Sequence, residues 1–139
     1  IGSKELVNIA DTGYGISQIL PIIYSAITNQ SNTIFIQQPE THLHPRLQAE
    51  VGSIICNSIK NSADKNWILE THSEILLLRI LKLIRKGEIN SNFLRIYYVD
   101  QFKNKGAVIK RMYISEKGEL KTQWPEGFFS EDIDEIFDN

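Results

Sequence analysis

Two short apolar runs, each of which ends abruptly in polar side chains, constrain the fold of this chain more than any other feature. The first run, Ile34 to Ile36, leads directly into amides, a proline and a carboxylate. The second run, Trp67 to Leu69, leads into an acidic, histidine-containing segment. Runs of this length are typical of buried strands. Because ligands of open α/β sheets bind at the carboxyl ends of the strands, we expect the two polar segments to share one edge.

Segments with helical spacing of apolar residues lie before, between and after the two runs. Ser73 suits the N-cap of the last of them, and Gly87 suits its C-terminal end. The predicted helices cover residues 16–28, 45–60 and 74–85.

Two further strands, over residues 94–99 and 108–114, are separated by a polar, glycine-containing turn and predict an antiparallel hairpin. The order strand, helix, strand, helix, hairpin predicts an α/β fold whose first two strands are parallel. A chain of 139 residues suffices for one domain, so we expect a single domain over residues 1–139.

Composition narrows the class of protein. With 42% hydrophobic and 23% charged residues the chain is typical of a globular protein. Its net charge of −2 gives no overall electrostatic reason to bind nucleic acid. The net charge does not exclude a local basic patch. Cys56 is the single cysteine, which excludes a disulfide framework. No apolar run reaches membrane-spanning length, so we expect no membrane partner and a cytoplasmic location.

A glycine-containing turn opens the first predicted helix. Gly13 and Gly15 give backbone freedom there, and Ser17 and Gln18 follow at once. Backbone N–H groups at a helix N-terminus attract anions, so this segment is a candidate phosphate cradle. The motif alone favours a plain tight turn.

The polar edge supplies the candidate catalytic side chains. Gln37, Gln38 and Glu40 follow the first apolar run and could bind a metal-bound phosphate or orient a water; the alternative is a turn with exposed amides. His72 follows the second run and could act as a general base or donate a hydrogen bond to phosphate. The alternative for His72 is a residue that caps the next helix.

A metal site is a further alternative. Glu40, His42 and His44 alternate in sequence, so they would share one side of an extended segment, with His72 as a fourth ligand of a metal-dependent hydrolase. Pro45 argues against it, because proline is typical of a loop that enters a helix.

Taken in order, four motifs resemble those of the C-terminal half of an ABC-class ATPase head, in the SMC/RecF-like, AAA-type bacterial ATPases. The resemblance covers nearly the whole chain and implies part of a P-loop NTPase sheet with flanking helices and a C-terminal β-hairpin. The four motifs are the segments 11–21 (DTGYGISQILP), 37–45 (QQPETHLHP), 70–74 (ETHSE) and 124–129 (WPEGFF).

The resemblance implies roles for the candidate residues in binding ATP and Mg²⁺. Gly13, Gly15, Ser17 and Gln18 would form the signature loop, which contacts the γ-phosphate of a nucleotide held by the partner subunit of a homodimer. The remaining implied roles are Gln37 at the position that helps to hold Mg²⁺, Gln38 at the position of the hydrolytic glutamate, Glu40 as a substitute carboxylate, His42 and His44 as dimer contacts, and His72 as the switch histidine.

The chain departs from the family pattern in two ways. It contains no G-x-x-x-x-G-K-[ST] phosphate loop, and Gln37 is neutral where the pattern is acidic. We therefore expect the phosphate loop to lie upstream in a longer chain, the isolated chain to be inactive, and the complete protein to be a slow ATPase. The alternative is a catalytically silent interaction or dimerisation module. A nucleic acid or an effector protein is the expected further partner, in DNA repair or phage defence.

Overall fold

The chain forms two compact units, Ile1–Leu83 and Ile84–Asn139, each of which is described by itself. The single domain expected over residues 1–139 stays a prediction. The computed structural model describes residues 14–28, 32–62, 64–102 and 106–124.

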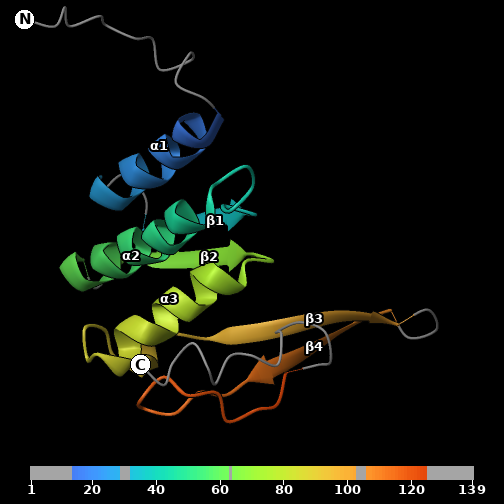
Figure 1. Cartoon of the computed structure of the whole chain (residues 1–139). Coiled ribbons are helices and arrows are strands. Elements are labelled where there is room, and N and C mark those ends of the chain that lie inside the picture. Colours follow the sequence, from blue (N-terminus) through green and yellow to red (C-terminus); the bar gives the residue numbers. More distant parts are fainter. Residues whose placement is uncertain (1–13, 29–31, 63, 103–105, 125–139) are drawn as a thin grey trace, which may run out of the picture. The chain divides into compact units, whose positions relative to one another are not determined.

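The first unit alternates helices and strands in the expected order (Figure 1). Pro45 opens the second helix, where its fixed φ and missing N–H are tolerated. None of the described helices is long and apolar enough to cross a membrane. The elements are α1 (Tyr14–Ile27), β1 (Thr33–Gln37), α2 (Pro45–Asn61), β2 (Asn66–Glu70) and α3 (Glu74–Arg85).

Strands β1 and β2 pair in parallel, from Thr33 opposite Asn66 to Gln37 opposite Glu70. This confirms the predicted pairing. The connection that contains α2 makes it possible, because parallel neighbours need a long crossover.

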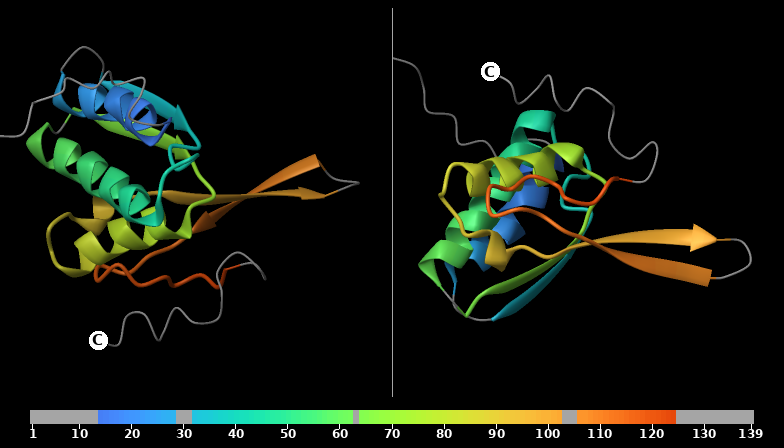
Figure 2. Two further views of the ribbon diagram at one scale, coloured as in Figure 1. Left: turned by 45° about the horizontal axis from the view of Figure 1, so that its top comes forward. Right: turned by 90° about the horizontal axis from the view of Figure 1, so that it is seen from below.

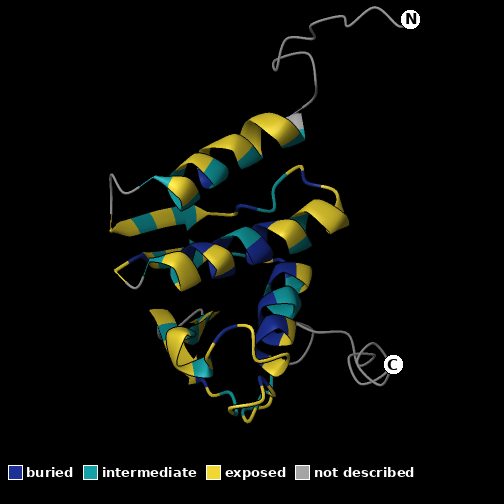
Figure 3. Ribbon diagram, turned by 90° about the vertical axis from the view of Figure 1, so that its left-hand side faces the viewer, coloured by how far each residue is buried: buried dark blue, intermediate teal, exposed yellow. Residues whose placement is uncertain are grey.

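The prediction that both strands are buried was wrong for one face of the sheet. Alternate residues are half-buried or exposed, and on the open face Phe35 is 73% and Ile68 52% exposed. In Figure 3 these two strands are coloured only as exposed or intermediate. The reason is that α1 and α2, which contact each other, lie on the same side of the sheet (Figure 2). On that side the indole Nε1 of Trp67 donates to Oγ of Ser58 in α2 at 2.8 Å.

A buried lysine holds the end of α1. Lys65 is 5% exposed, and its Nζ donates to the carbonyl oxygen of Ala26 at 2.6 Å. Carbonyl groups in the last turn of a helix lack partners within the helix and carry partial negative charge. The ammonium group therefore satisfies one of them and joins α1 to the start of β2.

Helices α2 and α3 approach closely at Gly52, which is buried. A Cβ at this position would lie 3.1 Å from the carbonyl oxygen of Leu76 and 3.4 Å from Cβ of Arg79. Beside it, Nε of Arg79 donates to Oγ of Ser53 at 2.9 Å. The absence of a side chain at position 52 thus sets how near the two helices can lie.

The second unit contains the predicted hairpin. Strands β3 (Ile96–Phe102) and β4 (Gly106–Met112) are antiparallel, with Ile96 opposite Met112, and a short 3-10 helix, η2 (Ser91–Phe93), precedes them. The strands are shifted by two or three residues from the predicted bounds, and residues 103–105 of the turn lie outside the described part.

One local prediction in the second unit can be compared with the structure. Gly87 has φ +71° and its N–H donates to the carbonyl oxygen of Ile84 at 2.8 Å, which confirms it as the residue that ends α3. Trp124 packs edge-on against Tyr98, with ring centroids 6.5 Å apart. The rest of the WPEGFF motif lies outside the described residues.

We predict that Gly52→Val lowers the free energy of unfolding by about 1–3 kcal/mol, because a branched side chain must push a backbone carbonyl of α3. Urea unfolding followed by circular dichroism measures this. The matched control is Asn57→Val, which puts the same residue at an exposed position of α2 and should cost less than about 1 kcal/mol. Equal losses in the two variants would contradict the close helix approach.

Candidate functional site

The carboxyl ends of β1 and β2 form one polar edge, as predicted from the two apolar runs. Gln37 and Glu70 are opposite each other in the last register pair. One residue further, the backbone N–H of Gln38 donates to the carbonyl oxygen of Glu70 at 2.7 Å. The segments that follow the strands therefore begin side by side.

Glu40 joins the segment after β1 to the segment after β2. Its Oε2 accepts a hydrogen bond from Oγ1 of Thr71 at 2.7 Å, and its Oε1 accepts one from the backbone N–H of His72 at 2.7 Å. Hydrogen bonds to an ionised carboxylate are stronger than those between neutral groups. Both carboxylate oxygens thus position the backbone that carries His72, whose side chain is exposed.

The same network continues into both helices that follow. Oγ of Ser73 accepts from the backbone N–H of Leu76 at 3.0 Å, which confirms the predicted N-cap of α3. The hydroxyl also donates to Oε1 of Gln48 at 2.7 Å, and Nε2 of Gln48 donates to the carbonyl oxygen of Leu43 at 3.0 Å. Gln48 of α2 and Ser73, the N-cap of α3, therefore fix both segments.

The backbone around Glu40 is strained. Gln38 has φ +45° and His42 has φ +60°, in the left-handed region that residues with a Cβ rarely adopt. Turn hydrogen bonds hold this shape: the N–H of Thr41 donates to the carbonyl oxygen of Gln38 at 3.1 Å, and the N–H of Leu43 donates to that of Glu40 at 3.0 Å. Strained residues of this kind gather at functional sites, where the surrounding structure enforces them.

The two histidines of this segment have different surroundings. Nδ1 of His44 accepts from the backbone N–H of Arg46 at 3.3 Å, so His44 is the N-cap of α2. His42 is exposed. Among the residues that the structure describes, no group of three or more His, Cys, Asp or Glu side chains could hold a metal ion. The hydrolase alternative, which needs Glu40, both histidines and His72 together, is therefore not supported.

The N-terminus of α1 lies against the segment after β1. The helix begins at Tyr14, earlier than predicted, so Gly15 is helical rather than part of the preceding turn. A Cβ on Gly15 would lie 3.5 Å from Cδ2 of Leu43 and 3.7 Å from the carbonyl oxygen of His42, which are ordinary contact distances.

The other residues predicted for this loop are placed only in part. Ser17 and Gln18 lie in the first turns of α1 and are exposed. Gly13 lies outside the described residues. The structure thus brings the start of α1, and not only the two strand ends, to the same edge.

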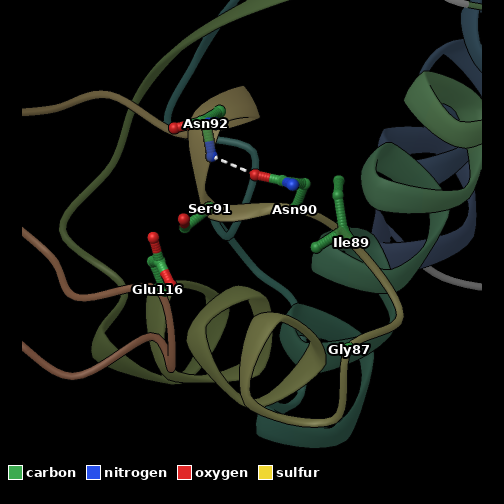
Figure 4. Close-up of a pocket in the computed structure, with 6 residues that line it drawn as sticks. All are labelled: Gly87, Ile89, Asn90, Ser91, Asn92 and Glu116. Atoms are coloured by element: carbon green, nitrogen blue, oxygen red, sulfur yellow. Dashed lines mark hydrogen bonds between the residues drawn. The ribbon is translucent and has the colours of Figure 1, made fainter.

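A separate hollow of about 370 Å³ lies in the second unit (Figure 4). None of the residues predicted for the site lines it. Its one charged side chain is Glu116, and Oδ1 of Asn90 is occupied by the backbone N–H of Asn92 at 2.8 Å. This hollow has the polar lining of a surface loop and carries no arrangement that suggests chemistry.

Three residues of the polar edge were missed as site residues from the sequence: Gln48, Glu70 and Thr71. Glu70 could have been predicted from the equal lengths of the two strands. Parallel strands that end at Gln37 and Glu70 place these two residues opposite each other. Gln48 gave no signal, since a polar residue in the first turns of a helix is ordinarily exposed.

The fold and the polar edge define a mixed α/β module consistent with part of a P-loop-like nucleotide-binding domain. The sequence profile of the family described as "AAA domain, putative AbiEii toxin, Type IV TA system" matches residues 2–79, more than half of the chain. The chain belongs to this family and carries an AAA-type, ATPase-like domain. Searches of curated proteins and of solved structures gave no match.

We predict that Glu40→Ala lowers the free energy of unfolding by roughly 1.5–3 kcal/mol, because two hydrogen bonds to a charged group are lost. The backbone N–H of His72 should also exchange with solvent at least about tenfold faster, as measured by amide hydrogen exchange in NMR. Glu50→Ala is the control, since Glu50 is an exposed acid of α2. Unchanged exchange at His72 would show that Glu40 does not hold this segment.

Proposed function

We propose that the chain supplies the signature, Walker B, D-loop and switch-histidine parts of an ABC-class ATPase. The observation that carries this proposal is the hydrogen-bonded edge at which Gln38, Glu40 and His72 follow two parallel strands. Nucleotides bind at such an edge in α/β domains. The family match supports the ATPase class and is coarser than the roles proposed here.

Phosphoryl transfer depends on positioning and on stabilisation of charge more than on covalent chemistry. Gln38 is exposed and has φ +45°, directly after β1, so its amide is suited to orient the attacking water. His72, on the segment that Glu40 holds, is suited to donate a hydrogen bond to the terminal phosphate. Magnesium neutralises phosphate charge when it is bound, and Gln37, the last residue of β1, would hold a magnesium-bound water.

The signature and dimer roles complete the proposal. Gly13, Gly15, Ser17 and Gln18 at the start of α1 would offer helix N-terminal N–H groups to the phosphate held by a second subunit. The contact of Gly15 with the 38–44 segment places this start beside the proposed dimer-contacting residues, His42 and His44. The phosphate-binding loop has to come from a segment or subunit other than these residues, because the sequence contains none.

A catalytically silent interaction module is the second candidate. The neutral side chain of Gln37 favours it, since an amide cannot neutralise Mg²⁺ or take a proton. The fold and the polar edge would then be kept for assembly and not for turnover. Calorimetry of the natural gene product with Mg-ATP separates binding from its absence.

We predict that Gln37→Glu, made in the natural gene product at its full length, raises the rate of ATP hydrolysis by at least about tenfold. The physical reason is that a carboxylate restores about 1.4 kcal/mol or more of charge stabilisation in the transition state. Steady-state phosphate release measures the rate. Gln101→Glu is the control, because it makes the same change at an exposed position of β3. A binding-competent protein whose hydrolysis does not rise would count against the Walker B assignment.

A further inference from the structure

We propose that residues 131–138, an acidic segment of this chain, dock on one face of the β3–β4 hairpin. This open hairpin face consists of Tyr97 and Val99 in β3 and of Ile109 and Arg111 in β4. All of these residues belong to the second unit and lie outside the part of the chain that the family profile matches. The docking is therefore independent of the proposed ATPase role.

The strand register gathers exposed apolar side chains on the open hairpin face. Tyr97 is opposite Arg111 and Val99 is opposite Ile109, and residues opposite each other in an antiparallel pair point to the same side. The exposed fractions are 57% for Tyr97, 62% for Val99 and 67% for Ile109. A two-stranded ribbon is marginally stable in water unless its apolar face is packed, so a cover on this face would stabilise the hairpin.

The other face of the hairpin already has contacts within the unit. Side chains of a strand alternate between its two faces, so Tyr98 and Met112 point away from the open hairpin face. Tyr98 packs edge-on against Trp124, and Met112 is buried. The two faces of one ribbon therefore differ in that one is packed and the other is exposed.

Two arginines give the open hairpin face a positively charged end. Arg95 and Arg111 line the same hollow, of about 150 Å³, and none of the residues that line it is acidic. The guanidinium group of Arg111 lies over the ring of Tyr113, 5.0 Å from its centroid. Nη1 of Arg95 donates to the carbonyl oxygens of Asn92 at 2.8 Å and of Leu94 at 2.9 Å. Both guanidinium groups are thus held in place, and such groups bind carboxylates through two parallel hydrogen bonds.

The charges of the second unit are divided along the sequence. Residues 84–124 contain nine Lys and Arg against four Asp and Glu, whereas residues 125–139 contain six Asp and Glu and no Lys or Arg. Within the acidic segment, Ile133, Ile136 and Phe137 have the spacing that would place them on one side of a helical turn. The segment thus combines carboxylates for the arginines with apolar side chains for the exposed strands.

The connection to the acidic segment is long enough for this contact. Glu131 follows Trp124 by seven positions, and seven residues span up to about 23–25 Å. Neighbouring strands lie only about 4.8 Å apart, so the chain can pass around the edge of the ribbon from the Tyr98 side. A short linker gives an attached segment an effective concentration of the order of millimolar, which favours it over a separate anion such as nucleic acid.

The test places a nitroxide spin label on Asn139→Cys in the 139-residue chain labelled with ¹⁵N. Cys56→Ala removes the other labelling site; if this change lowers stability, Cys56 is retained, because it is only 3% exposed. We expect the label to broaden the backbone N–H signals of Val99 and Ile109. About 1 M NaCl should weaken the broadening, because the screening length is then about 3 Å.

Matched charge reversals on the two faces of the hairpin show whether the arginines hold the segment. Arg95→Glu combined with Arg111→Glu should reduce the broadening at least about fivefold, because both attractive pairs become repulsive. Lys110→Glu is the control, since Lys110 is opposite Tyr98 on the other face of the ribbon. It should reduce the broadening less than about twofold. Equal reductions would overturn the proposal, as would broadening that none of these variants changes.

A variant of the segment itself leaves the hairpin sequence intact and decides the outcome if the arginine variants fail to fold. It combines Glu131→Gln, Asp132→Asn, Asp134→Asn and Glu135→Gln. We expect the same loss of broadening as in the double arginine variant. Unchanged broadening would overturn the proposal, because the carboxylates would then have no role in docking.

Two further measurements identify other occupants of the open hairpin face. Spin-labelled chain without ¹⁵N is mixed with ¹⁵N chain without the label; broadening as strong as in the single chain would mean docking on a second copy and would overturn the proposal. A single-stranded oligonucleotide should bind the segment variant at least about fivefold tighter than the parent chain, because the acidic segment no longer competes. Equal binding to both would show that the segment does not occupy the face.

Discussion

The parallel pairing of β1 with β2 is the constraint on which the rest of the first unit depends. The strands are joined only through α2, so their register decides which side chains leave the sheet together. A slip of one residue would turn every side chain to the other face. The anchors against such a slip lie on the covered face, where Trp67 is tied to Ser58 of α2.

The Glu40 carboxylate joins the two segments that follow the strands, because it accepts hydrogen bonds from Thr71 and His72. Two strained residues, Gln38 and His42, flank it, and conformations of this kind cost on the order of 1–3 kcal/mol each. The hydrogen bonds that Glu40 accepts, and those that join Gln48 to Ser73 and to Leu43, offset that strain. The polar edge is thus held by side-chain hydrogen bonds together with the burial of Leu43.

The sequence was sufficient to predict the main helices and strands, although not all of their bounds and not the short helix η2. Local signals carried these predictions, namely the helical spacing of apolar residues, the N-cap Ser73 and the end residue Gly87. The sequence failed on burial of the strands, since an apolar residue such as Phe35 does not reveal which face is covered. It also did not assign Glu40 its hydrogen-bonding role, because that role depends on contacts with residues about thirty positions away.

The order of the strands also affects how the protein is made. β1 ends at Gln37, but its partner is complete only at Glu70, so the first strand leaves the ribosome well before the second. At about 5–20 residues per second this interval lasts a few seconds, during which an apolar strand has two unpaired edges. The polar edge therefore cannot assemble until β2 has been synthesised.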